Sequence, residues 1–317
     1  MSTINCQLSN RKTLVLLLGP TGVGKTELSL RLAEYYGCPI LNCDSRQLFR
    51  SIPVGTAAPT AEEQARVKHY FVAVRELEED YNAGRYERDA LALMQELFRT
   101  HDILVMTGGS MLYADAVCNG LDDLPAVPAE IRAEVSRRYE EQGLAWLQSE
   151  VQRLDPSYWE TVDRSNPVRL AHCVELCMTT GRPYSSLRSG AVRQRPFHIL
   201  KIALTRPREE LYDRINRRVL QMVENGLVEE AKAVYPKRHL NSLQTVGYRE
   251  LFAYMDGEYD LNRAIELIQQ NTRHYAKRQM TWFRRDKAIR WLNANDDYEK
   301  NILLIDSWLR ADGVQEE

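Results

Sequence analysis

The sequence lacks several of the signals that assign a chain to a common class of protein. Its Lys and Arg residues nearly balance its Asp and Glu residues, 42 against 44, so any RNA-binding surface has to be local. It has no apolar run of membrane length and no N-terminal signal peptide, and we therefore expect a cytoplasmic protein. Internal repeats and low-complexity segments are also missing. With 317 residues the chain suits one large or two ordinary domains.

Cysteine is sparse and forms no metal-binding pattern. None of the six cysteines belongs to a C-x-x-C pair. Cys173 and Cys177 share one face of a predicted helix, with His172 beside them. Reduced thiols packed in the interior are a simpler interpretation of these residues than a metal site.

One pattern has a specific chemical meaning, and it is Gly19-Pro20-Thr21-Gly22-Val23-Gly24-Lys25-Thr26. It fits G-x-x-x-x-G-K-[ST], a phosphate-binding loop, between a predicted buried strand at 14–18 and a predicted helix at 27–36. The glycines let the backbone wrap around an anion, and the first N–H groups of the helix point at it. Lys25 adds a positive charge, and the Thr26 hydroxyl is placed to bind Mg²⁺. The loop predicts a phosphate or pyrophosphate ligand without saying which molecule carries it.

Strands alternate with helices in the rest of the N-terminal part, which predicts an α/β fold with a parallel sheet. The expected strands lie at 39–43, 69–74 and 102–106, and the expected helices at 60–68 and 86–100. Ligands of such sheets bind at the carboxyl ends of the strands. Asp44 and Ser110 follow two of these strands, so we expect them beside the phosphate loop.

Asp44 and Ser110 are the candidate catalytic groups. A carboxylate at Asp44 could bind Mg²⁺ through water or accept a proton from a nucleophile, and the alternative is an N-cap of a short helix. The Ser110 hydroxyl could bond a leaving pyrophosphate oxygen or could simply cap the next helix. The preceding strand ends in Thr107, where phosphate-loop ATPases usually have an Mg²⁺-binding Asp. This difference argues against a motor or switch ATPase and favours a kinase-like or group-transfer enzyme.

The chain changes character at Leu121. A linker rich in Pro and Asp at 121–128 precedes residues that are almost all helix-patterned, and a strand pattern returns at 197–204. We interpret 121–194 as a helical insertion, and 11–120 with 195–317 as the phosphate-loop core and its C-terminal helices. The helices expected after the linker lie at 129–142, 143–153, 168–180, 208–225, 228–234 and 261–284.

Positive charge gathers locally in the C-terminal part. Arg214 and Arg218 lie on one helix face, which could be a solvated face or a clamp on pyrophosphate. Residues 271–287 mix basic side chains with aromatic ones, which is typical of proteins that bind an RNA backbone and stack on its bases. The alternative is an ordinary basic helix whose aromatic residues belong to the core.

Taken together, these motifs resemble the bacterial tRNA dimethylallyltransferases, also called tRNA isopentenyltransferases. The matching stretches are GPTGVGKT (19–26), NCDSRQLFR (42–50), GTAAP (55–59), GGSMLY (108–113), GLDDLPAVP (120–128), NPVRL (166–170), QTVGYREL (244–251) and NTRHYAKRQMTWFRRD (271–286). The resemblance covers nearly the whole chain. It implies a P-loop kinase-like core whose helical insertion helps to bind the tRNA anticodon stem-loop. It also implies transfer of a dimethylallyl group from dimethylallyl pyrophosphate to N6 of the adenosine 3′-adjacent to the anticodon.

The resemblance further implies roles for particular residues. The loop 19–26 and Arg214 or Arg218 would hold the donor pyrophosphate, with Mg²⁺ as cofactor. Asp44 matches the general base, and Ser110 matches a Thr that supports the leaving oxygen. Contacts with tRNA are implied for Asp44-Ser45-Arg46-Gln47, Val168-Arg169-Leu170-Ala171-His172, Gln244-Thr245-Val246-Gly247-Tyr248-Arg249 and Lys277-Arg278-Gln279-Met280-Thr281-Trp282-Phe283-Arg284. We expect a monomer.

The chain departs from the family pattern at a few loop positions. Ser110 replaces a Thr and keeps the hydroxyl, Ala58 replaces a Lys, and Asn82 and Arg85 stand where a Ser and an acidic residue are usual. We interpret these changes as lineage variation.

Two other functions remain open. The first is an adenylate-type isopentenyltransferase, although such an enzyme needs neither the insertion nor the basic helix. The second is an RNA-binding NTPase, although Thr107 at the strand end argues against it.

Overall fold

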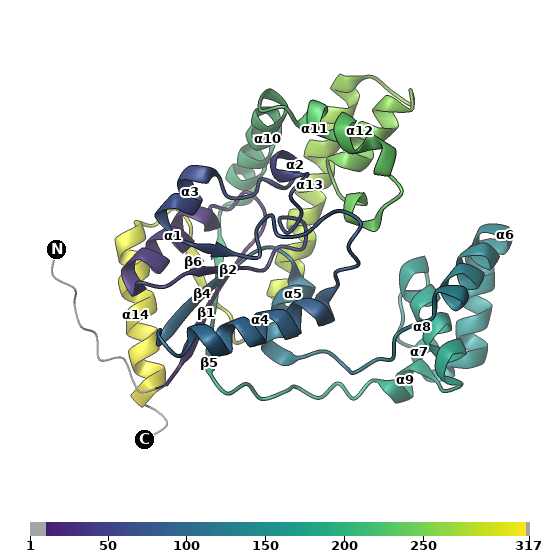
Figure 1. The fold of residues 1–317 in the computed structure, drawn as a ribbon, viewed down its shortest axis with the longest axis horizontal. Coiled ribbons are helices and arrows are strands. Elements are labelled where there is room, and N and C mark those ends of the chain that lie inside the picture. Colours follow the sequence, from purple (N-terminus) through teal and green to yellow (C-terminus); the bar gives the residue numbers. More distant parts are fainter. Residues whose placement is uncertain (1–10, 315–317) are drawn as a thin grey trace. The chain divides into compact units, whose positions relative to one another are not determined.

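The computed structural model describes residues 11–314, and the chain divides into two compact units (Figure 1). Unit 1 comprises the described residues up to Cys118 and from Arg195 onward, and unit 2 comprises Asn119–Gln194. No helix within the described residues is long and apolar enough to cross a membrane.

A parallel sheet forms the centre of unit 1, in the strand order β3-β2-β4-β1-β5-β6. Its strands are β1 (Thr13–Leu18), β2 (Ile40–Asn42), β3 (His69–Tyr70), β4 (Ile103–Thr107), β5 (His198–Thr205) and β6 (Arg290–Asn293). All residues of β1 are buried, as expected of an apolar strand covered on both faces. The α/β fold with a parallel sheet is thereby confirmed.

Helices cover both faces of this sheet. The helices of unit 1 are α1 (Lys25–Tyr36), α2 (Pro53–Thr56), α3 (Ala61–Arg66), α4 (Ala83–Leu97), α5 (Met111–Asn119), α10 (Arg208–Glu224), α11 (Leu227–Val234), α12 (Tyr248–Met255), α13 (Leu261–Phe283) and α14 (Tyr298–Val314), with 3₁₀ turns at Tyr235–Lys237 and Asn241–Leu243. The predicted helices of this part occur within a few residues of their expected bounds.

Strand β3 is shorter than the strand predicted at 69–74, and that prediction is wrong beyond Tyr70. Phe71 and Ala73 have φ of 62° and 50°, in the left-handed region that an extended strand excludes. The side-chain amide of Asn42 donates to the Phe71 carbonyl at 3.0 Å, and the Ala73 N–H donates to the Gln47 carbonyl at 2.9 Å. The chain therefore turns out of the sheet and bonds to the segment that follows β2.

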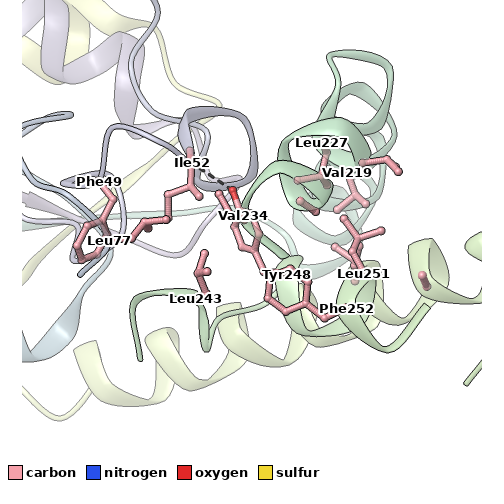
Figure 2. Close-up of a cluster of buried hydrophobic side chains, with 14 residues drawn as sticks. Phe49, Ile52, Leu77, Val219, Leu227, Val234, Leu243, Tyr248, Leu251 and Phe252 are labelled. Atoms are coloured by element: carbon pink, nitrogen blue, oxygen red, sulfur yellow. Dashed lines mark hydrogen bonds between the residues drawn. The ribbon is translucent and has the colours of Figure 1, made fainter. Parts of the chain in front are cut away.

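A hydrophobic cluster joins the C-terminal helices to the segment after β2 (Figure 2). At its centre the Tyr248 hydroxyl donates to Glu230 of α11. The Glu230 carboxylate also accepts the N–H groups of Val54 and Gly55, at 2.8 and 2.7 Å. A Cβ on Gly55 would come 2.2 Å from the Tyr248 hydroxyl oxygen, so only glycine fits there. The half-buried Glu230 carboxylate therefore links α2, α11 and α12.

Unit 2 is helical and has a core of its own. Its helices are α6 (Ala129–Leu154), α7 (Pro156–Trp159), α8 (Pro167–Thr180) and α9 (Tyr184–Leu187). Gly143, with φ 71° and ψ −167°, interrupts α6 at the place where the sequence predicts one helix to end and another to begin. Cys173 and Cys177 of α8 are buried in the apolar core with Leu170. Their surroundings agree with packed thiols.

The two connections between unit 2 and the sheet are bonded to each other within that unit. The Arg193 N–H donates to the Asn119 carbonyl at 2.8 Å. Asp122 accepts the N–H and the hydroxyl of Ser189 at 2.8 and 2.7 Å. On the side of unit 1, Arg195 forms a buried ion pair with Glu87 at 2.7 Å. Residues on each side of the unit boundary are therefore bonded within their own unit.

Candidate active site

The phosphate loop lies between β1 and α1, at the carboxyl edge of the sheet. Gly19, Gly22 and Gly24 have φ of 147°, 79° and 109°, a backbone that glycine adopts without strain. The Lys25 ammonium donates to the carbonyls of Gly19 and Pro20, at 2.8 and 3.1 Å. The loop is therefore wound around the Lys25 side chain.

The charge of Lys25 is held in an unfavourable environment. Its pKa is lowered to about 8, first because burial penalises the ammonium and second because Arg218 lies nearby, while Asp44 and Cys43 oppose the shift. Thr26, the next residue, is exposed in the first turn of α1. An anion bound at the loop would supply the negative charge that this cluster of cations lacks.

Helix α10 places arginines against the loop. Arg214 Nε donates to the Gly22 carbonyl at 2.9 Å, and Arg218 Nη1 donates to the Thr21 hydroxyl at 3.3 Å. Arg206, just after β5, donates to another loop carbonyl at 3.3 Å. Burial lowers the pKa of Arg218, and Asp44 opposes that shift. Both arginines singled out in the sequence contact the loop, with Arg218 on the side of Lys25 and Asp44.

Asp44 and Ser110 follow β2 and β4 at the same edge. Asp44 Oδ1 accepts the N–H of Arg46 at 2.9 Å inside a turn, and no helix begins there among the described residues, so the N-cap alternative is wrong. The Ser110 hydroxyl accepts the Ser45 N–H at 2.8 Å and donates to Ser45 Oγ at 2.9 Å. Ser110 therefore links the two strand ends and holds the turn that carries Asp44.

Gln279 of α13 also reaches the site, a contact that the sequence does not reveal. Its side chain has no exposed surface. Oε1 accepts the Thr21 N–H at 2.9 Å, and Nε2 donates to the Gly109 carbonyl at 2.7 Å. Tyr275, one turn earlier on α13, donates to the same carbonyl at 3.3 Å. Gln279 lies in a stretch expected at tRNA, but it faces the interior.

The stretches expected at tRNA differ in their exposure. Exposed side chains are those of Val168, Arg169, His172, Gln244, Arg249, Lys277, Arg278, Thr281 and Arg284. Half-buried residues are Asp44, Ser45, Arg46, Gln47, Ala171, Thr245, Val246, Met280 and Trp282. Buried residues are Leu170, Gly247, Tyr248, Gln279 and Phe283. The buried residues pack in hydrophobic cores or hold loops in place. The exposed and half-buried residues therefore form the surface of these stretches.

A phosphate loop after the central strand of a parallel sheet, with arginines and a carboxylate around it, defines a P-loop kinase-like α/β enzyme core. The model of one family, described as IPP transferase, matches residues 47–286. The chain belongs to the IPP transferase family.

Individual relatives extend this match over nearly the whole chain. It is 53% identical over 300 residues to tRNA dimethylallyltransferase 1 of Bacteroides fragilis, covering 95% of this chain and 98% of that protein. Over 287 residues it is 54% identical to tRNA dimethylallyltransferase 1 of Phocaeicola vulgatus, with 90% and 96% covered.

Solved structures show the same similarity. The full-length tRNA isopentenylpyrophosphate transferase of Bacillus halodurans is 33% identical, with a TM-score of 0.70, covering 96% of this chain and 98% of that one. A eukaryotic dimethylallyltransferase acting on tRNA has a TM-score of 0.76 at 23% identity, covering 90% of this chain and 74% of that one, and shares the fold.

Proposed function

We propose that this protein is a tRNA dimethylallyltransferase. It transfers the dimethylallyl group of dimethylallyl pyrophosphate to N6 of the adenosine 3′-adjacent to the anticodon and releases pyrophosphate. The proposal rests on one observation. A phosphate loop, two arginines and a carboxylate lie together at one edge of the sheet, in a chain of this family. We expect it to act as a monomer in the cytoplasm.

The phosphate loop holds the donor through its pyrophosphate. Backbone N–H groups at the start of α1 and the Lys25 ammonium bind the phosphate oxygens. Arg214 and Arg218 both approach the loop, and guanidinium groups suit the same oxygens. As negative charge grows on the leaving pyrophosphate, these cations stabilise it.

The residues present also fit a Mg²⁺ ion. The Thr26 hydroxyl is exposed at the start of α1, and Asp44 supplies a carboxylate that can act through water. Both are hard oxygen donors, which Mg²⁺ prefers together with substrate phosphates. When bound, the ion would neutralise charge on the pyrophosphate.

Asp44 serves as the general base. The adenine amino group is a weak nucleophile, because its lone pair is delocalised into the ring. As the bond from N6 to the allylic carbon forms, the carbon–oxygen bond breaks with its electrons leaving on pyrophosphate, and the N6 proton passes to the carboxylate. Oδ1 is engaged by Arg46, whereas Oδ2 accepts no hydrogen bond from the residues that the structure describes.

The tRNA is bound by exposed basic residues on separate elements. Lys277 and Arg278 on α13 and Arg169 on α8 are exposed and suit phosphate contacts. Unit 2, residues 119–194, would contribute to binding of the anticodon stem-loop. The target adenine has to leave its stack to reach a donor held at the loop, so it is flipped out of the anticodon loop.

The test is direct. The protein is incubated with dimethylallyl pyrophosphate, Mg²⁺ and either unmodified tRNA or AMP, and the digested product is analysed by mass spectrometry. A prenylated adenosine in tRNA supports the proposal, and a product on AMP alone would assign the adenylate-type activity. Inorganic pyrophosphate should compete with the donor, and Lys25→Ala should weaken donor binding while tRNA affinity stays close to that of the parent. If ATP competes far better and is hydrolysed, the protein is an NTPase.

A further inference from the structure

Gln279 joins two loops that follow different strands of the sheet. Its Oε1 accepts the N–H of Thr21 in the phosphate loop, and its Nε2 donates to the carbonyl of Gly109 after β4. Both ends of the amide are therefore used, and the side chain has no exposed surface. A buried amide with both partners in place is a rigid link, because breaking either bond leaves a buried polar group unpaired.

Each end of the link lies next to a group of the proposed chemistry. The Thr21 hydroxyl accepts a hydrogen bond from Arg218, so the same residue is held by α10 and by α13. A Cβ placed on Gly109 would come 2.6 Å from Gln279 Nε2 and 3.6 Å from Asp44 Oδ2. The Gln279 amide and the free carboxylate oxygen of Asp44 thus lie on one side of Gly109.

We propose that Gln279 is a positioning residue for prenyl transfer. It fixes the position of the loop that holds pyrophosphate relative to the strand end that carries Asp44. This inference rests on the proposed function and assigns Gln279 a role other than RNA contact. The reaction needs the donor carbon and the activated amino group at bonding distance. A shift of about 1 Å between the two loops can therefore slow the reaction by about two orders of magnitude.

The first variant is Gln279→Met, which keeps the length of the side chain and removes both hydrogen bonds. We expect kcat to fall about 10- to 100-fold, while the Kd for tRNA stays within about twofold of the parent because the residue does not reach the surface. Gln270→Met is the matched control, since Gln270 is an exposed glutamine on the same helix. That control should leave both quantities unchanged.

The second variant, Gln279→Glu, separates positioning from folding. A protonated carboxyl reproduces both bonds, with its carbonyl accepting from Thr21 and its O–H donating to Gly109. An ionised carboxylate loses the donor and adds a charge beside Asp44. The ratio of variant to parent kcat should therefore rise as the pH is lowered from about 8.5 to about 5.5, by up to about tenfold per pH unit above the pKa of the introduced group.

Binding of inorganic pyrophosphate without tRNA supplies a readout that needs no turnover. Gln279→Met should weaken it about threefold to tenfold, and Gln270→Met should not. Product formation by the parent tests the proposed function separately. The inference is overturned if Gln279→Met keeps the parent kcat and pyrophosphate affinity, if the Gln279→Glu ratio does not change with pH, or if both variants weaken tRNA binding at unchanged kcat.

Discussion

Donor affinity should fall as the pH rises above about 8, because Lys25 loses its charge there. Burial and the neighbouring Arg218 lower the pKa of Lys25 to about 8, and a bound pyrophosphate would favour the ammonium again. Binding is then linked to proton uptake. The affinity should drop about tenfold for each pH unit above this pKa, and about half a proton should be taken up per donor bound at the pKa itself.

Titration calorimetry with dimethylallyl pyrophosphate and Mg²⁺, without tRNA, measures both quantities. Runs from about pH 7 to about pH 9.5, in pairs of buffers with different ionisation enthalpies, give the number of protons taken up. Arg218→Gln should weaken binding at neutral pH yet move the inflection to higher pH, because it removes the like charge that lowers the pKa of Lys25. An affinity that does not change over this range, or an inflection that persists in Lys25→Met, would refute the reasoning.

The same shift affects folding in the absence of donor. The pKa of Lys25 is about 8 in the folded protein against an ordinary value of 10.5, so the unfolded chain binds more protons between these pH values. The contribution of Lys25 to the free energy of unfolding therefore rises with pH across this window. In urea unfolding at several pH values, the free energy of unfolding of the parent minus that of Lys25→Met should therefore increase with pH across this window.

Three further changes test other parts of the site. Asp44→Asn should lower turnover roughly 10²-fold or more while tRNA binding stays near normal. If this variant keeps the parent kcat, Asp44 is not the general base and only stabilises the turn. The double change of Lys277 and Arg278 to Ala should weaken tRNA binding and flatten its salt dependence by about one unit of log–log slope per lost phosphate contact. Filter binding at several salt concentrations measures this, and parallel slopes with equal intercepts would remove α13 from the RNA interface. Gly108→Ala should destabilise the fold by about 1–3 kcal/mol in urea unfolding, because its Cβ would come 2.5 Å from the Cys43 carbonyl carbon; an unchanged midpoint would contradict the predicted clash.

The elements around the phosphate loop could be predicted because their signals are local. An apolar run, a glycine pattern and a helix-patterned segment follow one another within residues 13–36. The parallel order of the strands then brings their carboxyl ends to one edge, which is why the sequence predicts that Ser110 lies near Asp44. The hydrogen bond between Ser110 and Ser45 is a consequence of that topology.

The remaining features depend on contacts between distant parts of the chain. Phe71 and Ala73 carry no sequence signal for a left-handed backbone, so the early end of β3 could not be foreseen. Gln279 looks like any polar residue of a basic helix, because its partner Thr21 lies at the other end of the sequence. The edge strand β6 has four residues, too few for a clear alternation of apolar and polar positions.

The hydrogen bond between Asn119 and Arg193 has a consequence for how such proteins can change. Because these two residues are bonded, the ends of the intervening segment lie together. The segment therefore connects α5 to β5 as a tight turn would. A segment inserted at such a point can lengthen, shorten or be exchanged for another without altering the strand register, since loop-closure entropy depends only weakly on length. The unit that we propose to bind the anticodon stem-loop could therefore be replaced, in evolution or by design, while the phosphate loop and its arginines keep their geometry.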